Sequence, residues 1–534
     1  MKSSIRGAIW IAIAVPALYQ IGLMITAISG RITYPYDLEW MEGGMLHHAL
    51  RIRAGQGIYV PPSIEFIPYL YTPLYPALLA WLGKWFGISY VLGRVVSVLS
   101  LAGIAITAFA SMVGRGWKSQ RVGEPIPPLT DPAPAGVERW CGAGLALGLF
   151  AAVYPYVDGW YDLVRSDTVF LFTVTAGIAA LPYLATSGNG VSGHARVGLG
   201  AAIFVLAFFC KQTGIFYVAL GTGIVVVVNW RRCATFVAIA GVLGLGISAV
   251  LNATSDGWYW TYISKIHRAH DFSMDRFWRS FGYILWHFPT LTVVIGIALV
   301  AVAITAAAHK PVPKSARTFA LWATAFAVSV VVGAVGWGTQ FAHFNAYMPA
   351  FLHGALAGGL AIAVIAGCAK AWCDDVRLVH GVAMSAAIAL AYPCVATRWD
   401  PSQWVPASAD AEAGDRLIQR LARLEGDIWM PSHPWYAVLA GKSPHVHRMG
   451  IKDVTTRQTR TVGGLQEALA SHRFSAIVMD ERDLFLELPQ LSATYELAQR
   501  LPETERPYLY SGARIRPQTI WLPRTSAHHG TVAK

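Results

Sequence analysis

Eleven long apolar segments constrain the fold of this chain more than any other feature of its 534 residues. A membrane-crossing helix needs about 20 consecutive, mostly apolar residues, and these segments hold between 14 and 25 residues each. Charged residues make up 13% of the chain, against roughly 25% in soluble domains. We therefore predict a mainly α-helical polytopic membrane protein of about eleven transmembrane helices. The segments cover residues 7–29, 90–113, 140–157, 168–186, 197–210, 213–229, 233–252, 284–308, 318–338, 346–369 and 379–397.

A further apolar stretch, Tyr71–Phe86, decides how the chain is oriented. It holds two prolines and Lys84, and it either spans the membrane or lies at its surface. If it lies at the surface, the basic loops fall on the same side as the N-terminus, as the positive-inside rule requires. We therefore place the N-terminus in the cytoplasm and the C-terminal tail outside. The basic loops are residues 115–139, 231–232, 310–317 and 370–377.

The positive charge is spread over the loops of the membrane part. Residues 1–397 hold 25 Lys and Arg against 15 Asp and Glu, which supplies +10 of the net charge of +12. These basic residues form no cluster in the sequence, so we expect no nucleic acid partner. They indicate instead that the chain is anchored to anionic membrane lipids.

The tail differs from the rest of the chain in composition and pattern. Residues 410–424 have helical periodicity, and residues 427–430 and 476–479 are typical of short buried strands. We therefore expect a small α/β extracytoplasmic domain at 398–534. It follows a transmembrane domain at 1–397, whose first outer loop covers residues 31–89.

The first outer loop carries three carboxylates within six residues: Asp37, Glu39 and Glu42. An amphipathic segment follows, which is typical of a helix that lies along the membrane surface. Carboxylates held there beside aromatic residues can have raised pKa values, which suits a general base. The alternative is that they are solvated acids of an ordinary loop.

Two further polar sites lie at the outer ends of apolar segments. Arg165 and Asp167 stand at the mouth of a long segment, and Lys211 separates two short apolar runs. Ions at a membrane rim are usually paired or functional, and a chain break at Lys211 directs its ammonium group toward an anion. The alternatives are a structural Arg–Asp pair and a lysine that snorkels to the surface.

Several histidines outside these sites carry weaker signals. His267 and His270 are spaced to share a metal ion, although an exposed polar loop explains them equally well. In the tail, we expect Ser432-His-Pro-Trp435 and His445–His447 to lie on the surface.

Short motifs along residues 8–370 follow one another in an order that resembles the GT-C glycosyltransferase superfamily, especially bacterial family 39. That family includes protein O-mannosyltransferases and aminoarabinose transferases. The chain departs from the family pattern at Met41, where an aspartate is usual, and at Asn345, where arginine is frequent. The motifs are Glu42-Gly43, Tyr71-Thr-Pro-Leu-Tyr75, Gly93-Arg94, Arg165-Ser-Asp167, Lys211-Gln-Thr and His343–Pro349.

The resemblance implies an inverting glycosyltransferase at the outer membrane face. Its donor would be a polyprenyl-phosphate sugar and its acceptor a lipid, a glycan or a protein. A first-loop carboxylate would act as the general base. The resemblance also admits a divalent metal ion, for which the sequence has no clear ligand set. The implied site residues are Asp37, Glu39, Glu42 and Asp167 for catalysis, Lys211, Arg94 and His343 for the donor phosphate, and Arg165, Tyr71, Tyr75, Gln212 and Asn345 for the acceptor.

Two other classes of function remain open at this point. A lipid or solute transporter should show internal repeats and charges near the middle of the membrane, and the sequence shows neither. A non-enzymatic assembly or glycan-binding protein should tolerate neutralisation of Asp37, Glu42 and Asp167.

Overall fold

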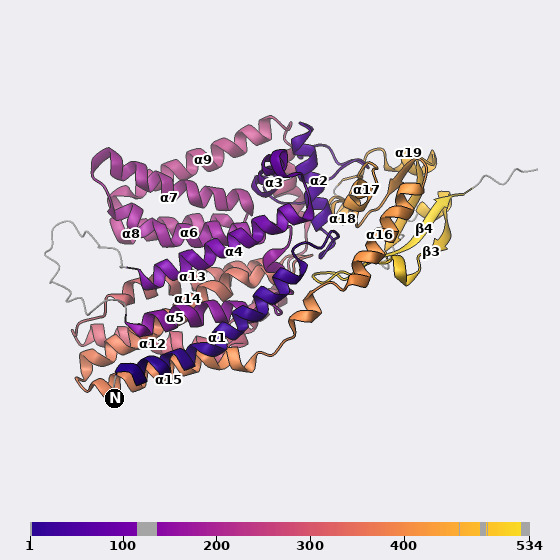
Figure 1. The fold of residues 1–534 in the computed structure, drawn as a ribbon. Helices are drawn as coiled ribbons and strands as arrows, with labels where there is room; N and C mark the ends of the chain where they lie inside the picture. Colours follow the sequence, from indigo (N-terminus) through magenta and orange to yellow (C-terminus); the bar gives the residue numbers. More distant parts are fainter. Residues whose placement is uncertain (1–2, 115–135, 459, 481–487, 489, 525–534) are drawn as a thin grey trace, which may run out of the picture.

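The computed structural model of the chain describes residues 3–114, 136–458, 460–480, 488 and 490–524. Within these described residues, eleven helices form a bundle that ends on a small C-terminal domain (Figure 1). They are α1 (Ser3–Arg31), α4 (Tyr90–Val113), α5 (Val137–Ala152), α6 (Asp167–Thr186), α7 (Gly190–Cys210), α8 (Gly214–Asn229), α9 (Cys233–Ala253), α12 (Pro289–Ala307), α13 (Ser315–Gly338), α14 (Met348–Trp372) and α15 (Val376–Ala396).

The predicted mainly α-helical, polytopic membrane fold is confirmed. Among the described residues, nine segments are long and apolar enough to cross a membrane, and one of them, Gly214–Ala253, contains both α8 and α9. The 16-residue α5 completes the set of eleven. One predicted boundary is wrong: the segment at 284–308 is divided, because α12 begins at Pro289. Proline is favoured in the first helical turn and disrupts a helix interior, which explains the division there.

Helix α14 lies at the centre of the bundle, and most of its residues are buried there. Its closest approach to α5 is at Gly142 and Gly359, where a Cβ atom on either residue would lie 2.3 Å from the carbonyl oxygen of the other. Helices in membranes associate through such small residues because lipid supplies no hydrophobic drive between them. Larger side chains here would separate α5 from α14.

Shorter helices gather at the end of the bundle that meets the tail, where α2 (Glu42–Arg53) and α3 (Leu74–Phe86) lie side by side (Figure 1). The 13 residues of α3 extend about 20 Å, which is too short to cross a membrane and agrees with the predicted surface position. The amphipathic α11 (Met274–His287) exposes Trp278 and Trp286, as expected for a helix at a membrane interface. A one-turn helix, α10 (Trp258–Trp260), precedes it.

The tail forms the predicted small α/β domain. Its four-stranded sheet has the order β1-β2-β4-β3, in which β1 and β2 are parallel and the other neighbours are antiparallel. Ile428 of β1 pairs with Ala476 of β2, so the two predicted strands are confirmed. The elements are α16 (Ser408–Arg423), β1 (Asp427–Trp429), α17 (Pro434–Leu439), α18 (Arg448–Thr455), α19 (Leu465–Ala470), β2 (Phe474–Asp480), α20 (Leu491–Thr494), β3 (Tyr495–Arg500) and β4 (Pro517–Pro523).

The polar loops expected on one face do meet at one end of the bundle, against the tail (Figure 1). Side-chain contacts join loops that lie far apart in sequence: Arg165 contacts Glu39, Lys211 contacts Asp167, and Asn345 contacts Asp167. The basic loops 231–232, 310–317 and 370–377 lie at the opposite end, while residues 115–135 are outside the described part of the chain.

Candidate active site

The three carboxylates of the first outer loop lie in one tight turn. Asp37, Glu39 and Glu42 are all buried, with relative exposures of 0%, 1% and 0%. Glu42 Oε2 accepts a hydrogen bond from the Leu38 backbone at 2.7 Å, and Asp37 Oδ1 accepts one from the Gly43 backbone at 3.0 Å. The reading of these residues as solvated loop acids is therefore wrong, because the tail and the bundle enclose the turn.

Glu42 forms a wholly buried ion pair with Arg94 of α4. Arg94 Nη2 lies 2.7 Å from Glu42 Oε2, and the guanidinium also donates to the backbone carbonyls of Tyr34 and Tyr36 at 2.5 and 2.6 Å. Glu42 Oε1 in turn accepts from the backbone of Val164 at 2.8 Å. This arrangement ties the first loop to α4 and to the loop before α6. Glu42 and Arg94 make all of these contacts with other buried groups of the protein, which favours a structural role for the two residues.

Glu39 is bound more loosely than its two neighbours. Oε2 accepts from Arg165 Nη1 at 3.3 Å and from the Met41 backbone at 3.2 Å, and the described residues show no hydrogen bond to Oε1. Burial raises the pKa of the Glu39 carboxyl to about 8, although Arg165 opposes that rise. A carboxyl that titrates near neutral pH is suited to accept a proton in catalysis.

Arg165 connects Glu39 to the residues at the start of α6. Its Nη2 donates to the Tyr71 hydroxyl at 2.9 Å, and its guanidinium lies 5.3 Å from the centre of the Trp160 ring. The Trp160 indole donates to Asp167 Oδ2 at 3.0 Å. Two side chains therefore link Glu39 to Asp167. Trp160 was not singled out from the sequence, although it stands only a few residues before Arg165.

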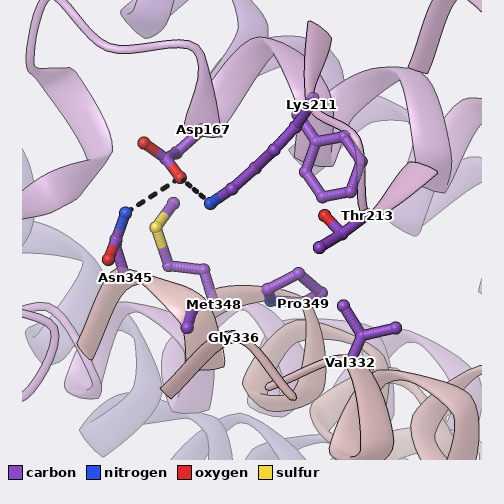
Figure 2. A pocket seen from close by; sticks show the side chains of 10 residues that line it. Asp167, Lys211, Thr213, Val332, Gly336, Asn345, Met348 and Pro349 are labelled. Carbon is purple, nitrogen blue, oxygen red and sulfur yellow. Dashed lines mark hydrogen bonds and ion pairs between the residues drawn. The ribbon is translucent and has the colours of Figure 1, made fainter. Parts of the chain in front are cut away.

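Asp167 contacts polar side chains that lie at the ends of other helices or between them. Lys211 Nζ lies 2.6 Å from its Oδ1, and Asn345 Nδ2 donates to the same oxygen at 3.0 Å (Figure 2). Asp167 is the first residue of α6, and Lys211 has extended backbone between α7 and α8. Asn345 lies in the 3-10 turn Phe344–Tyr347 that leads into α14.

These three residues line one side of a cavity in the bundle. The cavity encloses about 340 Å³, part of it open to solvent. Lys211 keeps 18% of its side chain exposed, and its ammonium group is paired with Asp167. Val332 and Pro349 lie across this space from Asp167 (Figure 2). The rest of the lining is mostly apolar and includes Phe170 and Met348. The cavity therefore combines one cation with a mostly apolar lining.

Of the other predicted binding residues, His343 lies nearest this network. Its ring stacks on Trp160 with 5.1 Å between centres, and its Nε2 lies 3.7 Å from Asp158. Gln212 donates to the Leu70 carbonyl and Tyr75 to the Gly93 carbonyl, both inside the protein. The structure thus brings seven of the predicted residues together in one network. Glu42, Arg94 and Tyr75 lie outside this network and make buried contacts within the protein. The seven are Glu39, Tyr71, Arg165, Asp167, Lys211, His343 and Asn345.

The donor set around the cavity does not fit a divalent metal ion. Asp167 is paired with Lys211 and Glu39 with Arg165, so each carboxylate already has a cation beside it. Within the described part of the chain, no cluster of three or more His, Cys, Asp or Glu residues could hold a metal. His267 and His270 have ring centres 5.8 Å apart, and His270 lies 3.1 Å from Asp453 of α18.

The expectation that the tail histidines lie on the surface is wrong. His433, His445 and His447 are buried, with exposures of 1%, 2% and 3%, as is Ser432 at 3%. The tail packs against the first outer loop, and these side chains fill the junction. His433 lies between Asp37 and Asp480, at 2.8 and 3.4 Å. No local pattern reveals the contact with Asp37, because it lies 396 positions from His433.

No protein-family model and no curated protein matches this sequence significantly. Among solved structures, the chain is similar to ArnT from Cupriavidus metallidurans bound to undecaprenyl phosphate, with a TM-score of 0.55 and 14% identity over 97% of this chain and 98% of that one. The apo state of ArnT gives 0.53 and 15% over 96% and 97%. A weaker likeness, with a TM-score of 0.49 and 10% identity over 93% and 73%, is to the oligosaccharyltransferase AglB from Archaeoglobus fulgidus. The chain therefore shares the fold of ArnT, a polytopic helical membrane protein fold of the kind that the sequence predicted.

Proposed function

We propose that this protein is a glycosyltransferase that moves a sugar from a polyprenyl-phosphate donor to an acceptor hydroxyl. The observation that carries the proposal is the cavity in which Lys211 and Asp167 face an apolar wall, joined through Trp160 and Arg165 to the buried Glu39. The likeness in fold to ArnT, which was solved with undecaprenyl phosphate bound, supports the class of donor.

Lys211 is the proposed ligand of the donor phosphate. Its side chain is partly exposed and lines the cavity, and Asp167 balances its charge while no anion is bound. When the bond between sugar and phosphate breaks, negative charge grows on the leaving phosphate. A cation that binds this charge more strongly in the transition state than in the ground state accelerates the reaction. His343, stacked on Trp160, is a second candidate for contact with the phosphate.

Glu39 is the proposed general base. Glu42 is neutralised by Arg94, and Asp37 is held by His433 and the Gly43 backbone, whereas both hydrogen bonds of Glu39 go to one oxygen. Glu39 would take the proton from the acceptor hydroxyl as that oxygen attacks the anomeric carbon with inversion. The bond from this carbon to the phosphate oxygen breaks, and polyprenyl phosphate leaves with the bonding electrons.

The acceptor must reach a carboxylate that the tail covers. A Cβ atom on Gly512 would lie 2.8 Å from Glu39 Cγ, so the chain around Gly512 closes over the side chain. We therefore propose that this segment shifts when the acceptor binds. Arg165 and Tyr71, which contact Glu39 directly or through each other, would then orient the acceptor.

The proposed location is a bacterial inner membrane, with the N-terminus in the cytoplasm and the active site outside. The positive-inside rule supports this orientation, because the basic loops lie at the end of the bundle opposite the tail. We propose that the membrane domain ends at residue 397, directly after α15, and that 398–534 form the outer domain.

Sugar transfer by the purified protein in nanodiscs tests the proposal. Radiolabelled polyprenyl-phosphate sugars are supplied as a panel, with membrane extract as the source of acceptor. We expect one donor to be consumed and its label to appear in an acceptor fraction. If no donor is consumed by a well-folded preparation, the protein is not this type of enzyme, and a binding or transport function takes precedence.

A further inference from the structure

His433 occupies a buried position between two carboxylates from different parts of the chain. Its Nδ1 lies 2.8 Å from Oδ2 of Asp37 in the first outer loop, and its Nε2 lies 3.4 Å from Oδ1 of Asp480 at the end of β2. The side-chain exposures of Asp37, His433 and Asp480 are 0%, 1% and 3%. Burying ionisable groups is costly unless they are paired, so these three residues depend on one another.

Other groups around His433 complete its environment. The Tyr436 ring stacks on the imidazole with 5.1 Å between centres, and its hydroxyl accepts from the Asp37 backbone at 3.3 Å. His447 and Arg448 are the further titratable groups whose charges act on this cluster. From the bundle side, the Tyr90 hydroxyl approaches Asp37 and Glu42 contributes its charge.

The two carboxylates hold His433 as a cation. Burial would lower the pKa of His433, but Asp480 and Asp37 outweigh that effect and raise it to about 10. Burial acts to raise the pKa of Asp480, yet His433 lowers it below its usual value. The imidazolium and the Asp480 carboxylate therefore persist at neutral pH, and His433 donates a hydrogen bond to Asp37.

Asp37 transmits this contact to the turn that carries Glu39. Its Oδ2 faces His433 while its Oδ1 accepts from the backbone of Gly43, so one carboxylate fixes both the start and the end of the turn. A second contact from the tail acts on the same turn, because the backbones of Tyr510 and Ser511 donate to the Leu38 carbonyl at 3.0 and 2.9 Å. Glu39 lies between these fixed points.

We propose that His433 is a positioning residue for the glycosyl transfer, which acts through Asp37 to hold Glu39 in the geometry required of the base. This inference rests on the proposed function. It gives the tail domain a role in assembling the active site in addition to any contact with the acceptor. His433 itself touches neither donor nor acceptor.

His445 provides a matched control. It is also buried, and it also joins the first outer loop to the tail, with Glu65 at 3.2 Å and Asp427 at 2.8 Å. Its loop partner lies beyond α2, outside the turn of residues 37–43. A residue that only docks the tail should therefore behave like His445, whereas a positioning residue should not.

The test compares His433→Gln with His445→Gln in the full-length protein in nanodiscs. A displacement of about 1 Å can cost on the order of 10²-fold in rate, so we expect His433→Gln to lower kcat by roughly 10- to 100-fold. KM for the donor should stay within about twofold of wild type, because Lys211 and its cavity are unaffected. His445→Gln should leave kcat and KM near wild type. Equal effects of the two variants on kcat would overturn the proposal.

A second variant covers the case in which His433→Gln does not fold. Asp480→Asn keeps the shape of the cluster and the contact between His433 and Asp37, so it should fold and lower kcat by a smaller factor. The pH profile is the accompanying readout: the acid limb of kcat/KM, which reports Glu39, should move in Asp480→Asn and not in His445→Gln. If Asp480→Asn changes neither kcat nor the acid limb of the kcat/KM profile, the proposal is overturned.

Hydrogen exchange separates failure of this inference from failure of the proposed function. The amides of Leu38 and Gly43 donate to Glu42 and Asp37, so they report the turn directly and need no substrate. We expect them to exchange at least about 10-fold faster in a folded His433 or Asp480 variant than in His445→Gln. Unchanged exchange overturns the positioning role whatever the activity. Faster exchange with no donor consumed by wild type instead rejects the glycosyltransferase.

Discussion

Lys211 Nζ lies 2.6 Å from Asp167 Oδ1 at the wall of a cavity whose other side is apolar. The chain reaches this geometry by interrupting the helices on both sides, because Lys211 lies between α7 and α8 and Asp167 begins α6. A lysine that snorkels freely to the surface would not be held this way. In the proposed function, this charged pair receives the phosphate of the lipid donor.

The first prediction concerns Lys211 itself. Lys211→Ala should lower kcat/KM for the polyprenyl-phosphate donor by about 10²- to 10³-fold, because the leaving phosphate loses its cation. Steady-state transfer in nanodiscs measures the effect. Lys84→Ala, at the exposed end of α3, is the matched control and should behave like wild type. Equal rates for Lys211→Ala and Lys84→Ala would remove Lys211 from the site.

The second prediction is a pH dependence set by Glu39. Burial raises its pKa from 4.5 to about 8, and only the ionised carboxylate can accept a proton. The kcat/KM of wild type should therefore rise as pH increases toward 8 and level off above it. A profile that is flat from pH 6 to pH 9 would exclude Glu39 as the base.

The same group makes a separate prediction for stability. Since burial raises the pKa of Glu39 from 4.5 to about 8, the folded protein binds this proton more tightly, and stability falls as pH rises from about 4.5 to about 8 and is level above that. Glu39→Gln cannot lose a proton, so thermal unfolding should show the variant gaining stability relative to wild type between about pH 5 and pH 8. A constant difference in Tm over this range would contradict the assignment.

A third site, the pair of Glu42 and Arg94, is predicted to stabilise the fold and not to bind donor. Removing one partner leaves a buried charge uncompensated, which typically costs about 3–5 kcal/mol, so Arg94→Met should lower Tm strongly. Combining it with Glu42→Leu should restore part of the loss. A single Arg94 variant of normal stability that no longer binds polyprenyl phosphate would instead make Arg94 a donor ligand.

Gly512 offers a test of the tail segment over Glu39. It has φ of +66°, and an added Cβ would lie 2.8 Å from Glu39 Cγ, while Gly441 has φ of +74° with no atom within 4 Å. Alanine should strain the backbone at both positions, but only Gly512→Ala should displace Glu39. We expect kcat to fall about 10-fold or more in Gly512→Ala and to stay unchanged in Gly441→Ala. Transfer assays on both variants decide this, and equal kcat values would contradict it.

Much of the fold could be read from the sequence because it depends on local composition. The apolar length of each segment predicts a helix, and the alternation of helices brings polar loops to one end. Lys211 could be singled out because it interrupts an apolar run. The division before Pro289 was missed, since residues on both sides of the proline are apolar enough to continue the segment.

The charge pairing could not be predicted in this way. Whether a first-loop carboxylate is free or neutralised depends on partners far along the chain: Arg94 for Glu42, Arg165 for Glu39 and His433 for Asp37. His433 and Asp37 are 396 positions apart. Tertiary packing alone decides such contacts, which is why the sequence identified three candidate bases and the geometry is needed to favour one.

The measurement that tests the central claim most directly is release of polyprenyl phosphate in a single turnover. Wild type, Glu39→Gln and a control, Glu65→Gln, are each mixed with labelled donor and acceptor in nanodiscs. Glu65 is a half-exposed carboxylate of the same loop, paired with His445 and Arg473. We predict that Glu39→Gln slows release by about 10²- to 10⁴-fold and that Glu65→Gln matches wild type. Equal rates for all three proteins would contradict the assignment of Glu39 as the base.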